Sequence, residues 1–382
     1  MVYRVYVVMY LKIKLFFSPG LLVRNIALLF VLTFMFVLSS CNDMEDQLRT
    51  NELPVTEDFS TFFILSEGLF NLNNSTLAMY NLNTKETFTD FFLSVNQRGL
   101  GDTANDMGLY GSKLYVVVTV SSQVEILDAS TGKSLKRIPM FNGQGIAREP
   151  RFIDFHNGKA YVCSFDGTVT KIDTTSMEIQ GFVTCGRNPD GICITNDKIY
   201  VSNSGGLSYP NYDNTVSVID IESFQEIKKI TVGSNPYKIH ADSEGDVYVV
   251  SRGNYGLQSA LFQKINSKTD EVSQSFDDIQ ALNFTIHNDT AYIYNYHPAS
   301  NQYSFVVFDC KSEIILNDNF ITDGTVLHNP FGIDVNPANG DVYITDAYAY
   351  TIWGDVLCFD NQGKLKFRLR EIGLNPNKVV FK

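Results

Sequence analysis

The sequence predicts an all-β fold: a seven-bladed β-propeller with four-stranded antiparallel blades, the last of them closed by both termini. Three observations predict it, namely a recurring anchor motif, a tyrosine-containing strand after each anchor, and incomplete blades at the two ends. A hydrophobic fraction of 44% and an aromatic fraction of 13% exclude a disordered chain and supply a large core.

The anchor is Asn or Glu, then Pro, two variable residues, and Ile or Val. It occurs as EPRFI, NPDGI, NPYKI, NPFGI and NPNKV, with prolines at positions 150, 189, 236, 330 and 376. The intervals are 39, 47, 94 and 46 residues, so one copy is missing from the longest interval, where IQALNFTIHNDTAYIY (279–294) takes its place without a proline. GDTANDMGLYGSKLYVV (101–117) is an earlier degenerate copy. Such a period indicates a repeat architecture.

Each anchor is followed by a tight Gly/Asn/Asp turn and a strand with a tyrosine, as in KLYVVV, KAYVCS, KIYVSN, DVYVVS, TAYIYN and DVYITD. A third strand ends near Asp or Asn, and a short fourth strand follows, as in SLKRIPM. At the N-terminal end, FFILSEG, STLAMYNL and ETFTDFFL (62–93) supply second, third and fourth strands, and NPNKVVFK supplies the missing first strand. Joining the ends removes the free sheet edges. No segment has a convincing helical period, which disfavours a helical solenoid.

Residues 1–40 are predicted to be a lipoprotein signal peptide. The apolar run IALLFVLTFMFVL follows Arg24, and LSSC (38–41) closes it, so cleavage would leave a lipidated Cys41. The alternative, a retained membrane helix, is disfavoured because the stretch is short. Residues 41–60 are expected to form an acidic flexible tether and residues 61–382 the propeller. The sequence NDMEDQ after Cys41 resembles the signal that places Bacteroidetes lipoproteins on the outer face of the outer membrane.

The net charge limits the classes of partner, and the positions of the cysteines indicate the role of their thiols. The net charge is −12, from 42 acidic and 30 basic residues, which excludes nucleic acid as a partner because binding it requires clustered Lys and Arg. The five cysteines after Cys41 form no CxxC pair and lie mostly in predicted strands, so buried core thiols are expected.

One face of the ring is predicted to bind a ligand. In a propeller the connections from second to third strand share a face with those from fourth strand to the next first strand. The first-to-second turns are short and lack aromatic residues, whereas the second-to-third loops are often long and aromatic. Rings supply contact area and amides supply directed hydrogen bonds. The alternative is that some of these tyrosines only pack over the blade tops. The candidate ligand-binding residues are Phe70, Asp106, Arg151, Phe165, Arg187, Asn203, Tyr209, Tyr212, Arg252, Tyr255, Tyr296, Tyr348, Tyr350 and Trp353.

We favour ligand binding over enzymatic activity at this face. The sequence has no nucleophile elbow, phosphate loop or HExxH motif, and its five histidines are scattered. The strongest enzymatic set is Glu67, Asn203, Asn295 and Asp346, whose oxygens suit a hard divalent cation, as in a calcium-dependent lactonase-type hydrolase. We expect instead a non-enzymatic binder with no catalytic residue, no metal site and no required cofactor.

The stretches SEGLFNLNNSTLAMYN (66–81), LGDTANDM (100–107) and NPANGDVYITDA (336–347) resemble the YVTN-type, YncE-like propeller lipoproteins of Bacteroidetes, most of all their BtuG branch. The resemblance implies a surface lipoprotein that holds cobalamin or a related corrinoid on its aromatic rim. It also implies a BtuB-like TonB-dependent transporter as partner in the outer membrane. Family members often carry tryptophans at this rim, where this chain keeps only Trp353. A propeller that binds another nutrient or a glycan is the alternative.

Overall fold

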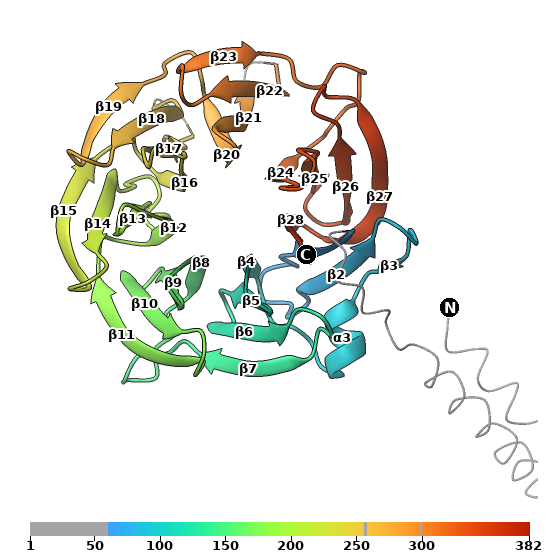
Figure 1. The fold of residues 1–382 in the computed structure, drawn as a ribbon, viewed down its shortest axis with the longest axis horizontal. Coiled ribbons are helices and arrows are strands. Elements are labelled where there is room, and N and C mark those ends of the chain that lie inside the picture. Colours follow the sequence, from blue (N-terminus) through green and yellow to red (C-terminus); the bar gives the residue numbers. More distant parts are fainter. Residues whose placement is uncertain (1–59, 256–257, 298–299) are drawn as a thin grey trace, which may run out of the picture. The chain divides into compact units, whose positions relative to one another are not determined.

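The computed structural model describes residues 60–255, 258–297 and 300–382, and these form seven four-stranded antiparallel sheets around a central axis (Figure 1). The expected signal peptide, the lipidation site Cys41 and the tether up to residue 59 lie outside the described residues. The prediction of a seven-bladed propeller is confirmed. Among the described residues, no helix is long and apolar enough to cross a bilayer.

Blade 1 combines both ends of the chain, and the other blades follow in sequence order. Blade 1 contains β28 (Pro376–Phe381), β1 (Thr61–Ser66), β2 (Thr76–Asn81) and β3 (Thr87–Phe88). Blade 2 contains β4 (Ala104–Tyr110), β5 (Lys113–Val118), β6 (Gln123–Asp128) and β7 (Ser134–Pro139). Blade 3 contains β8 (Pro150–His156), β9 (Lys159–Ser164), β10 (Thr168–Asp173) and β11 (Glu178–Thr184). Blade 4 contains β12 (Pro189–Thr195), β13 (Lys198–Asn203), β14 (Thr215–Asp220) and β15 (Gln225–Thr231).

Blade 5 contains β16 (Pro236–Ala241), β17 (Val247–Ser251), β18 (Leu261–Asn266) and β19 (Glu271–Ser275). Blade 6 contains β20 (Ala281–His287), β21 (Thr290–His297), β22 (Gln302–Asp309) and β23 (Ile314–Asn317). Blade 7 contains β24 (Pro330–Val335), β25 (Val342–Asp346), β26 (Trp353–Phe359) and β27 (Leu365–Leu374). The proline-free repeat copy around residue 285 is therefore a complete blade, as predicted.

The ring closes by pairing β28 with β1. Phe62 pairs with Phe381 and Phe63 with Val380, and the backbone N–H of Lys382 donates to the carbonyl oxygen of Thr61 at 2.9 Å. Both termini therefore stabilise one blade, and the sheet edges that they would otherwise leave open are paired.

The core lies between neighbouring blades, which cover both faces of the inner strands. Five of the six second-strand tyrosines that mark the repeat are fully buried there, and the sixth, Tyr292, is partly buried; the five are Tyr115, Tyr161, Tyr200, Tyr248 and Tyr343. The Tyr248 hydroxyl bonds to the neighbouring blade, since it donates to the carbonyl oxygen of Cys310, directly after β22, at 2.8 Å. All five described cysteines are buried and free, which confirms the expectation of core thiols.

One expected strand is shorter than predicted. The segment ETFTDFFL forms only the two-residue strand β3, after which the chain enters a short helix, α3 (Phe91–Asn96). Asp90 caps this helix by accepting the backbone N–H of Leu93 at 3.2 Å. Phe91 and Phe92 are buried, so two adjacent rings reach the core from a helix turn, which a strand would point to opposite faces.

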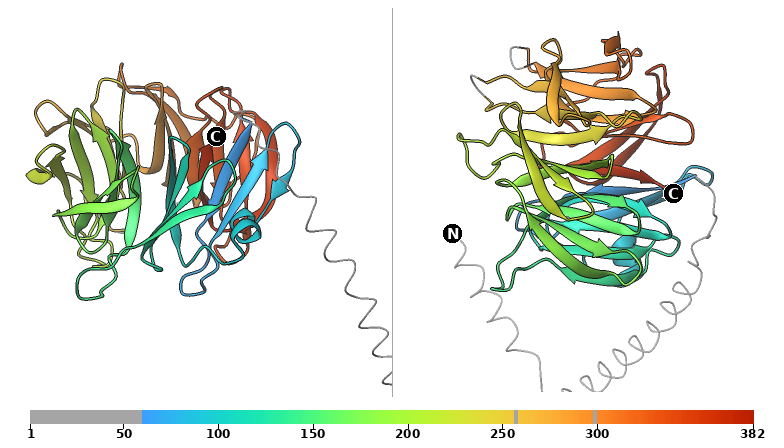
Figure 2. Two further views of the ribbon diagram at one scale, coloured as in Figure 1. Left: turned by 60° about the horizontal axis from the view of Figure 1, so that its bottom comes forward. Right: turned by 60° about the vertical axis from the view of Figure 1, so that its left-hand side comes forward.

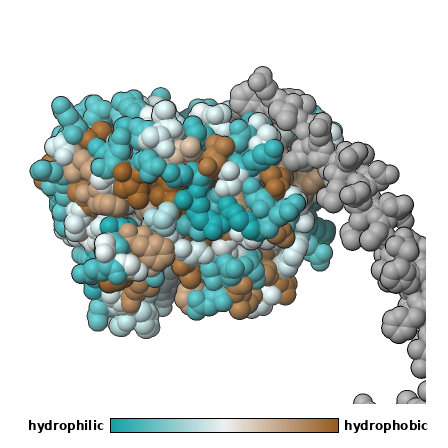
Figure 3. Space-filling model, turned by 90° about the horizontal axis from the view of Figure 1, so that it is seen from below, coloured by the Kyte–Doolittle hydropathy of each residue, from teal (hydrophilic) through white to brown (hydrophobic). Residues whose placement is uncertain are grey.

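The two faces of the ring carry different connections, and Figure 2 shows loops that project beyond the strands in two oblique views. On the side of the ring in Figure 3, hydrophobic side chains are interspersed among hydrophilic ones.

Candidate functional site: the channel mouth and its aromatic rim

Each of the seven innermost strands begins with a β-bulge. In β8, Pro150 pairs with Ser164 and Phe152 with Cys163, so Arg151 is an extra residue without a counterpart on β9. The same one-residue shift occurs at the start of β4, β12, β16, β20, β24 and β28. A bulge bends its strand and changes the direction of a side chain.

These repeated bulges place one variable residue from each of five blades at the channel. The residues that follow the first position of the seven strands are Asn105, Arg151, Asp190, Tyr237, Leu282, Phe331 and Asn377. Five of them line a cavity of about 110 Å³ at the mouth of the channel, together with Glu67, Arg252 and Asn283. The blade repeat thus supplies the scaffold, and the bulge supplies the position at which the blades differ chemically.

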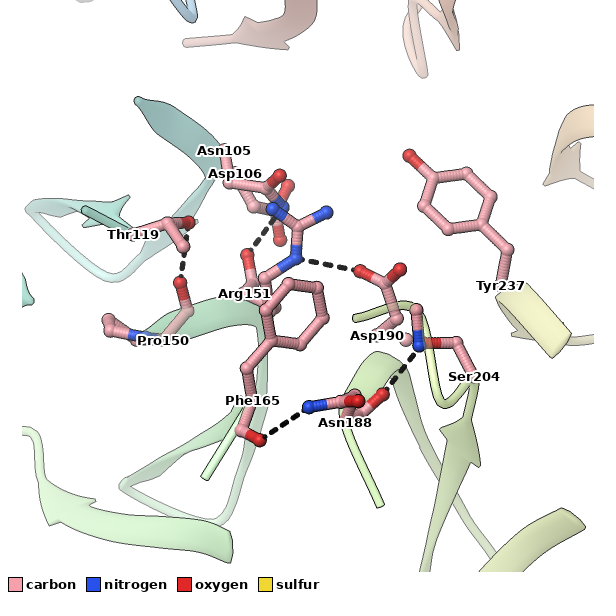
Figure 4. A network of polar contacts seen from close by, with 12 residues as sticks. Asn105, Asp106, Thr119, Pro150, Arg151, Phe165, Asn188, Asp190, Ser204 and Tyr237 are labelled. Atoms are coloured by element: carbon pink, nitrogen blue, oxygen red, sulfur yellow. Dashed lines mark hydrogen bonds and ion pairs between the residues drawn. The ribbon is translucent and has the colours of Figure 1, made fainter. Parts of the chain in front are cut away.

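Positively charged, negatively charged and aromatic side chains meet in this mouth. The Arg151 Nε lies 2.7 Å from a carboxylate oxygen of Asp190, and its guanidinium lies 4.5 Å from the centroid of the Phe165 ring (Figure 4). Asn105 holds the Arg151 backbone by donating to its carbonyl oxygen at 2.7 Å. Arg151 is thereby held by an ion pair and a ring contact at its side chain and by the Asn105 hydrogen bond at its backbone. It presents the rest of its guanidinium to the channel.

Glu67 and Arg252 occupy equivalent positions, one residue beyond the ends of β1 and β17. The guanidinium of Arg252 lies 3.4 Å from the centroid of the Tyr237 ring, and its Nε donates to the carbonyl oxygen of Leu282 at 3.2 Å. Burial raises the pKa of Glu67 to about 7, although the positive charge of Arg151 opposes this rise. The mouth therefore offers two fixed guanidinium groups and a carboxyl group that titrates near neutral pH.

Deeper in the channel lies a second cavity, of about 130 Å³, which Asp106 and Lys238 share with the mouth. Asp106 accepts the backbone N–H of Ile153 at 3.1 Å. The Lys238 ammonium lies 4.4 Å from the centroid of the Phe152 ring, and burial, aided by the neighbouring charge of Lys378, lowers its pKa to about 8. Asp106, one of the predicted ligand residues, is thus a buried group at the junction of the two cavities and not a rim residue.

Three of the predicted tyrosines cluster on the rim. The Tyr209 and Tyr212 ring centroids are 6.0 Å apart, and those of Tyr212 and Tyr255 are 6.2 Å apart. Tyr209 and Tyr255 leave 72% and 65% of their surface exposed, so the three neighbouring rings present aromatic surface to the solvent. We call these three residues the tyrosine cluster. Beside it lies a groove of about 810 Å³ lined by Tyr212 and by amides that include Asn211, Asn214 and Gln258.

Arg187 supports the tyrosine cluster from below. Its guanidinium donates to the carbonyl oxygen of Asn211 at 3.0 Å and to the Ser208 hydroxyl at 3.3 Å. It therefore fixes the loop between β13 and β14 that carries Tyr209 and Tyr212.

The other predicted aromatic residues of the loops differ in how much of each ring is available to a ligand. Tyr350 is exposed and lies 5.9 Å from the Phe331 ring, so it extends the rim over the mouth, whereas Phe70 is exposed on the loop between β1 and β2. Tyr296 and Tyr348 instead satisfy their hydroxyls internally, with Asn301 at 2.9 Å and Asp355 at 2.6 Å. Trp353 belongs to β26, where it pairs with Leu374.

The oxygen set considered for a calcium-dependent hydrolase does not come together. Asn203 is fully buried and bonds to Gly186, Thr215 and Ser217, so it does not reach the rim. Asp346 is fully buried and accepts backbone N–H groups of His328 and Asn329 at 2.9 Å. Asn295 is buried and donates to the Ser304 hydroxyl at 3.3 Å, whereas Glu67 lines the mouth cavity. Within residues 60–255, 258–297 and 300–382, no three His, Cys, Asp or Glu side chains are grouped to hold a metal ion.

Sequence reasoning missed several mouth residues, chiefly Tyr237, Phe331, Asn105 and Asn377. A signal for them was present, because each follows directly on the anchor proline or its counterpart. The variable position of the anchor is the one that the bulge turns toward the axis. Reading the seven copies at that position would have identified these residues.

Seven four-stranded blades around a channel with a polar, aromatic mouth define the class of this protein: a seven-bladed β-propeller with a differentiated loop face. Residues 60–371 match the family described as a domain of unknown function, DUF5074, and the chain belongs to that family. No curated protein matches the chain significantly.

Solved structures similar to this chain share its fold at low sequence identity. A quinonprotein alcohol dehydrogenase-like protein from Bacteroides thetaiotaomicron is 17% identical, with a TM-score of 0.61 over 85% of this chain and 78% of its own. A functionally unknown protein from Desulfotomaculum acetoxidans is 12% identical, with a TM-score of 0.60 over 84% of this chain and 98% of its own. Hydrazine synthase of Kuenenia stuttgartiensis is 17% identical, with a TM-score of 0.51 over 66% and 74%. These likenesses support the propeller architecture alone.

Proposed function

We propose that this protein is a non-enzymatic surface lipoprotein that captures cobalamin or a related corrinoid on its aromatic loop face. The observation that carries the proposal is the tyrosine cluster of Tyr209, Tyr212 and Tyr255, exposed beside an amide-lined groove of about 810 Å³. The resemblance of residues 66–81, 100–107 and 336–347 to the BtuG branch supplies the ligand class.

The sizes of the cavities favour a ligand that lies across the rim. The mouth cavity of about 110 Å³ admits a small group and not a macrocycle, whereas the groove beside the tyrosine cluster has the volume of a typical small-molecule site. A corrinoid is broad, rigid and fringed with amides. The amides of Asn211, Asn214 and Gln258 suit that fringe, and a tyrosine ring suits stacking on the nucleotide base.

The charges of the mouth suit a ligand of mixed charge. Arg252 and Arg151 can receive a phosphodiester, and Glu67 limits the net positive charge at the same place. The positive charge of cobalt offsets the phosphodiester, so the acidic protein as a whole need not repel the ligand.

The proposal includes the membrane context predicted from the leader. A lipid on Cys41 would anchor the propeller to the outer membrane, with the acidic tether between them, and a BtuB-like TonB-dependent transporter would receive the corrinoid. No catalytic step and no resident cofactor is required.

The test is a titration of the full chain with cyanocobalamin, followed by calorimetry and by the absorbance of the corrinoid. We expect saturable binding with one ligand per chain at micromolar or lower concentration. Neither heat nor a spectral change at micromolar ligand would refute a corrinoid as the ligand.

A further inference from the structure

The loop face holds a second groove, separate from the mouth and from the tyrosine cluster. It has a volume of about 740 Å³ and lies between blades 6 and 7, formed by the start of β22, the connection from 318 to 329 and the loop after β25. None of its lining residues lines the mouth or the groove beside the tyrosine cluster. Its volume falls within the range of small-molecule sites, roughly 300–1,000 Å³.

The lining of this groove contains no Asp, Glu, Lys or Arg. Its polar atoms come from amides, hydroxyls and one imidazole, in a chain whose net charge is −12. An ionic ligand would lose hydration here without gaining a formal countercharge from the lining, which is costly. The occupant that suits this lining is therefore neutral.

Some of the polar groups are already committed to the fold. The Asn329 amide accepts the Tyr303 hydroxyl at 2.9 Å and donates to the carbonyl oxygen of Tyr348. In contrast, the side-chain amides of Gln302 and Asn319 are exposed and bond to no other described residue. Each of these amides can both donate and accept, which matches a ligand hydroxyl.

His328 adds a third available polar group. Its Nδ1 lies 3.3 Å from a carboxylate oxygen of Asp346, which leaves Nε2 as the ring nitrogen for a ligand, and 59% of its side chain is exposed. Asp346 itself is fully buried, so it orients the imidazole from behind and adds no accessible charge to the groove.

Apolar surface completes the lining. The hydroxyls of Tyr303 and Tyr348 are bonded to Asn329 and Asp355, so these residues offer ring carbon to the groove. Val326 leaves 66% of its surface exposed beside them. Ring and aliphatic surface next to free amides suits a molecule with both hydroxyl edges and C–H faces.

We propose that the groove between blades 6 and 7 is a binding site for a neutral saccharide. Gln302, Asn319 and His328 hydrogen-bond its hydroxyls, and Tyr303, Tyr348 and Val326 contact its C–H faces. The site is independent of corrinoid capture at the tyrosine cluster, and the two proposals stand or fall separately.

The experiment is saturation-transfer NMR and calorimetry of the full chain, purified without sugar-based detergent. The probes are the neutral trisaccharides maltotriose, cellotriose and triacetylchitotriose, with trigalacturonate as the charged comparison. We expect at least one neutral trisaccharide to bind at millimolar concentration or below and trigalacturonate not to bind. The Gln302→Ala/Asn319→Ala double variant should bind it about tenfold more weakly, because it removes two side-chain amides that hydrogen-bond the saccharide.

Two controls make the outcome specific. Asn361→Ala removes an exposed amide from the turn between β26 and β27 on the opposite face and should leave saccharide binding unchanged. The double variant should also keep the cyanocobalamin titration of the parent chain. Absence of binding by all three neutral trisaccharides at 10 mM (about the upper limit for a useful site), or full binding by the double variant, would overturn the proposal.

Discussion

The guanidinium of Arg252 lies 3.4 Å from the centroid of the Tyr237 ring, and this contact joins the end of one strand to the start of its neighbour within blade 5. Tyr237 reaches the channel because of the bulge at the start of β16. Its hydroxyl makes no hydrogen bond with the described residues and points away from the strand that carries it in Figure 4. The ring therefore holds Arg252 in place, and the hydroxyl is left for a ligand.

This division of roles predicts different effects for two substitutions of Tyr237. Tyr237→Leu should lower the free energy of unfolding by about 1 kcal/mol because it removes the ring beneath the guanidinium. Tyr237→Phe keeps the ring and should be within about 0.5 kcal/mol of the parent. Urea unfolding of both variants measures the difference. Equal losses would mean that the ring contact with Arg252 contributes nothing.

The ion pair between Arg151 and Asp190 should couple the two residues strongly. Both side chains are mostly buried, so either one left alone is an unpaired charge in a low-dielectric site. We expect Arg151→Met and Asp190→Asn each to reduce the free energy of unfolding by about 2 kcal/mol, and the double variant to lose clearly less than the sum. A double-mutant cycle from urea unfolding gives the coupling. Additivity to within about 0.5 kcal/mol would show that the pair is not coupled.

The pKa of Glu67 makes stability depend on pH in a defined direction. Burial raises this pKa from its ordinary value of 4.5 to about 7, so between these pH values the folded protein keeps a proton that the unfolded chain has lost. Rising pH through this window therefore destabilises the parent chain. Because Glu67 is partly exposed, we expect Glu67→Gln to gain about 1 kcal/mol relative to the parent between pH 5 and pH 8.

The measurement is urea unfolding of both chains at the two pH values. Glu244→Gln, at an exposed turn between β16 and β17, is the matched control and should show no such gain. A Glu67→Gln gain that is equal at both pH values would contradict the assignment of this titration to Glu67.

The tyrosine cluster should contribute to binding without contributing to folding. Tyr209→Ala and Tyr255→Ala remove rings that are mostly exposed, so we expect each to weaken cyanocobalamin binding about tenfold, about 1.4 kcal/mol, with no loss of unfolding free energy. Ile227→Ala, an exposed residue on the outer strand β15, is the control and should bind as the parent does. Titrations of the three variants test this, and unchanged affinity in both tyrosine variants would remove the cluster from the site.

The blades were predictable from sequence because each one repeats a buried tyrosine strand and a proline anchor. Tyr115, Tyr161 and Tyr200 lie at equivalent positions in the second strands of three successive blades, and all three side chains are buried. The helix α3 was not predictable in this way, since the fourth strand of blade 1 ends after two residues and the chain then enters a helix that contains Phe91 and Phe92. A short apolar run fits a strand and a helix turn equally well until packing decides between them.

The site was harder to predict because a shift of one residue reverses the direction of a side chain. Asn203 ends β13 and is buried, whereas Arg252 lies one residue beyond the end of β17 and reaches the channel. Alternation along a strand makes these neighbouring positions point in opposite directions. The bulge at Tyr237 adds one more such shift, and sequence patterning did not reveal it.

We propose that the loop face, and not the opposite face, captures the ligand. Hydrogen–deuterium exchange of the full chain with saturating cyanocobalamin tests it most directly. We expect slower exchange in the loops at 204–214 and 252–255. We expect no change in the turns at 157–158, 196–197 and 288–289 on the opposite face. Slower exchange in those turns, or no change in either set of segments, would contradict it.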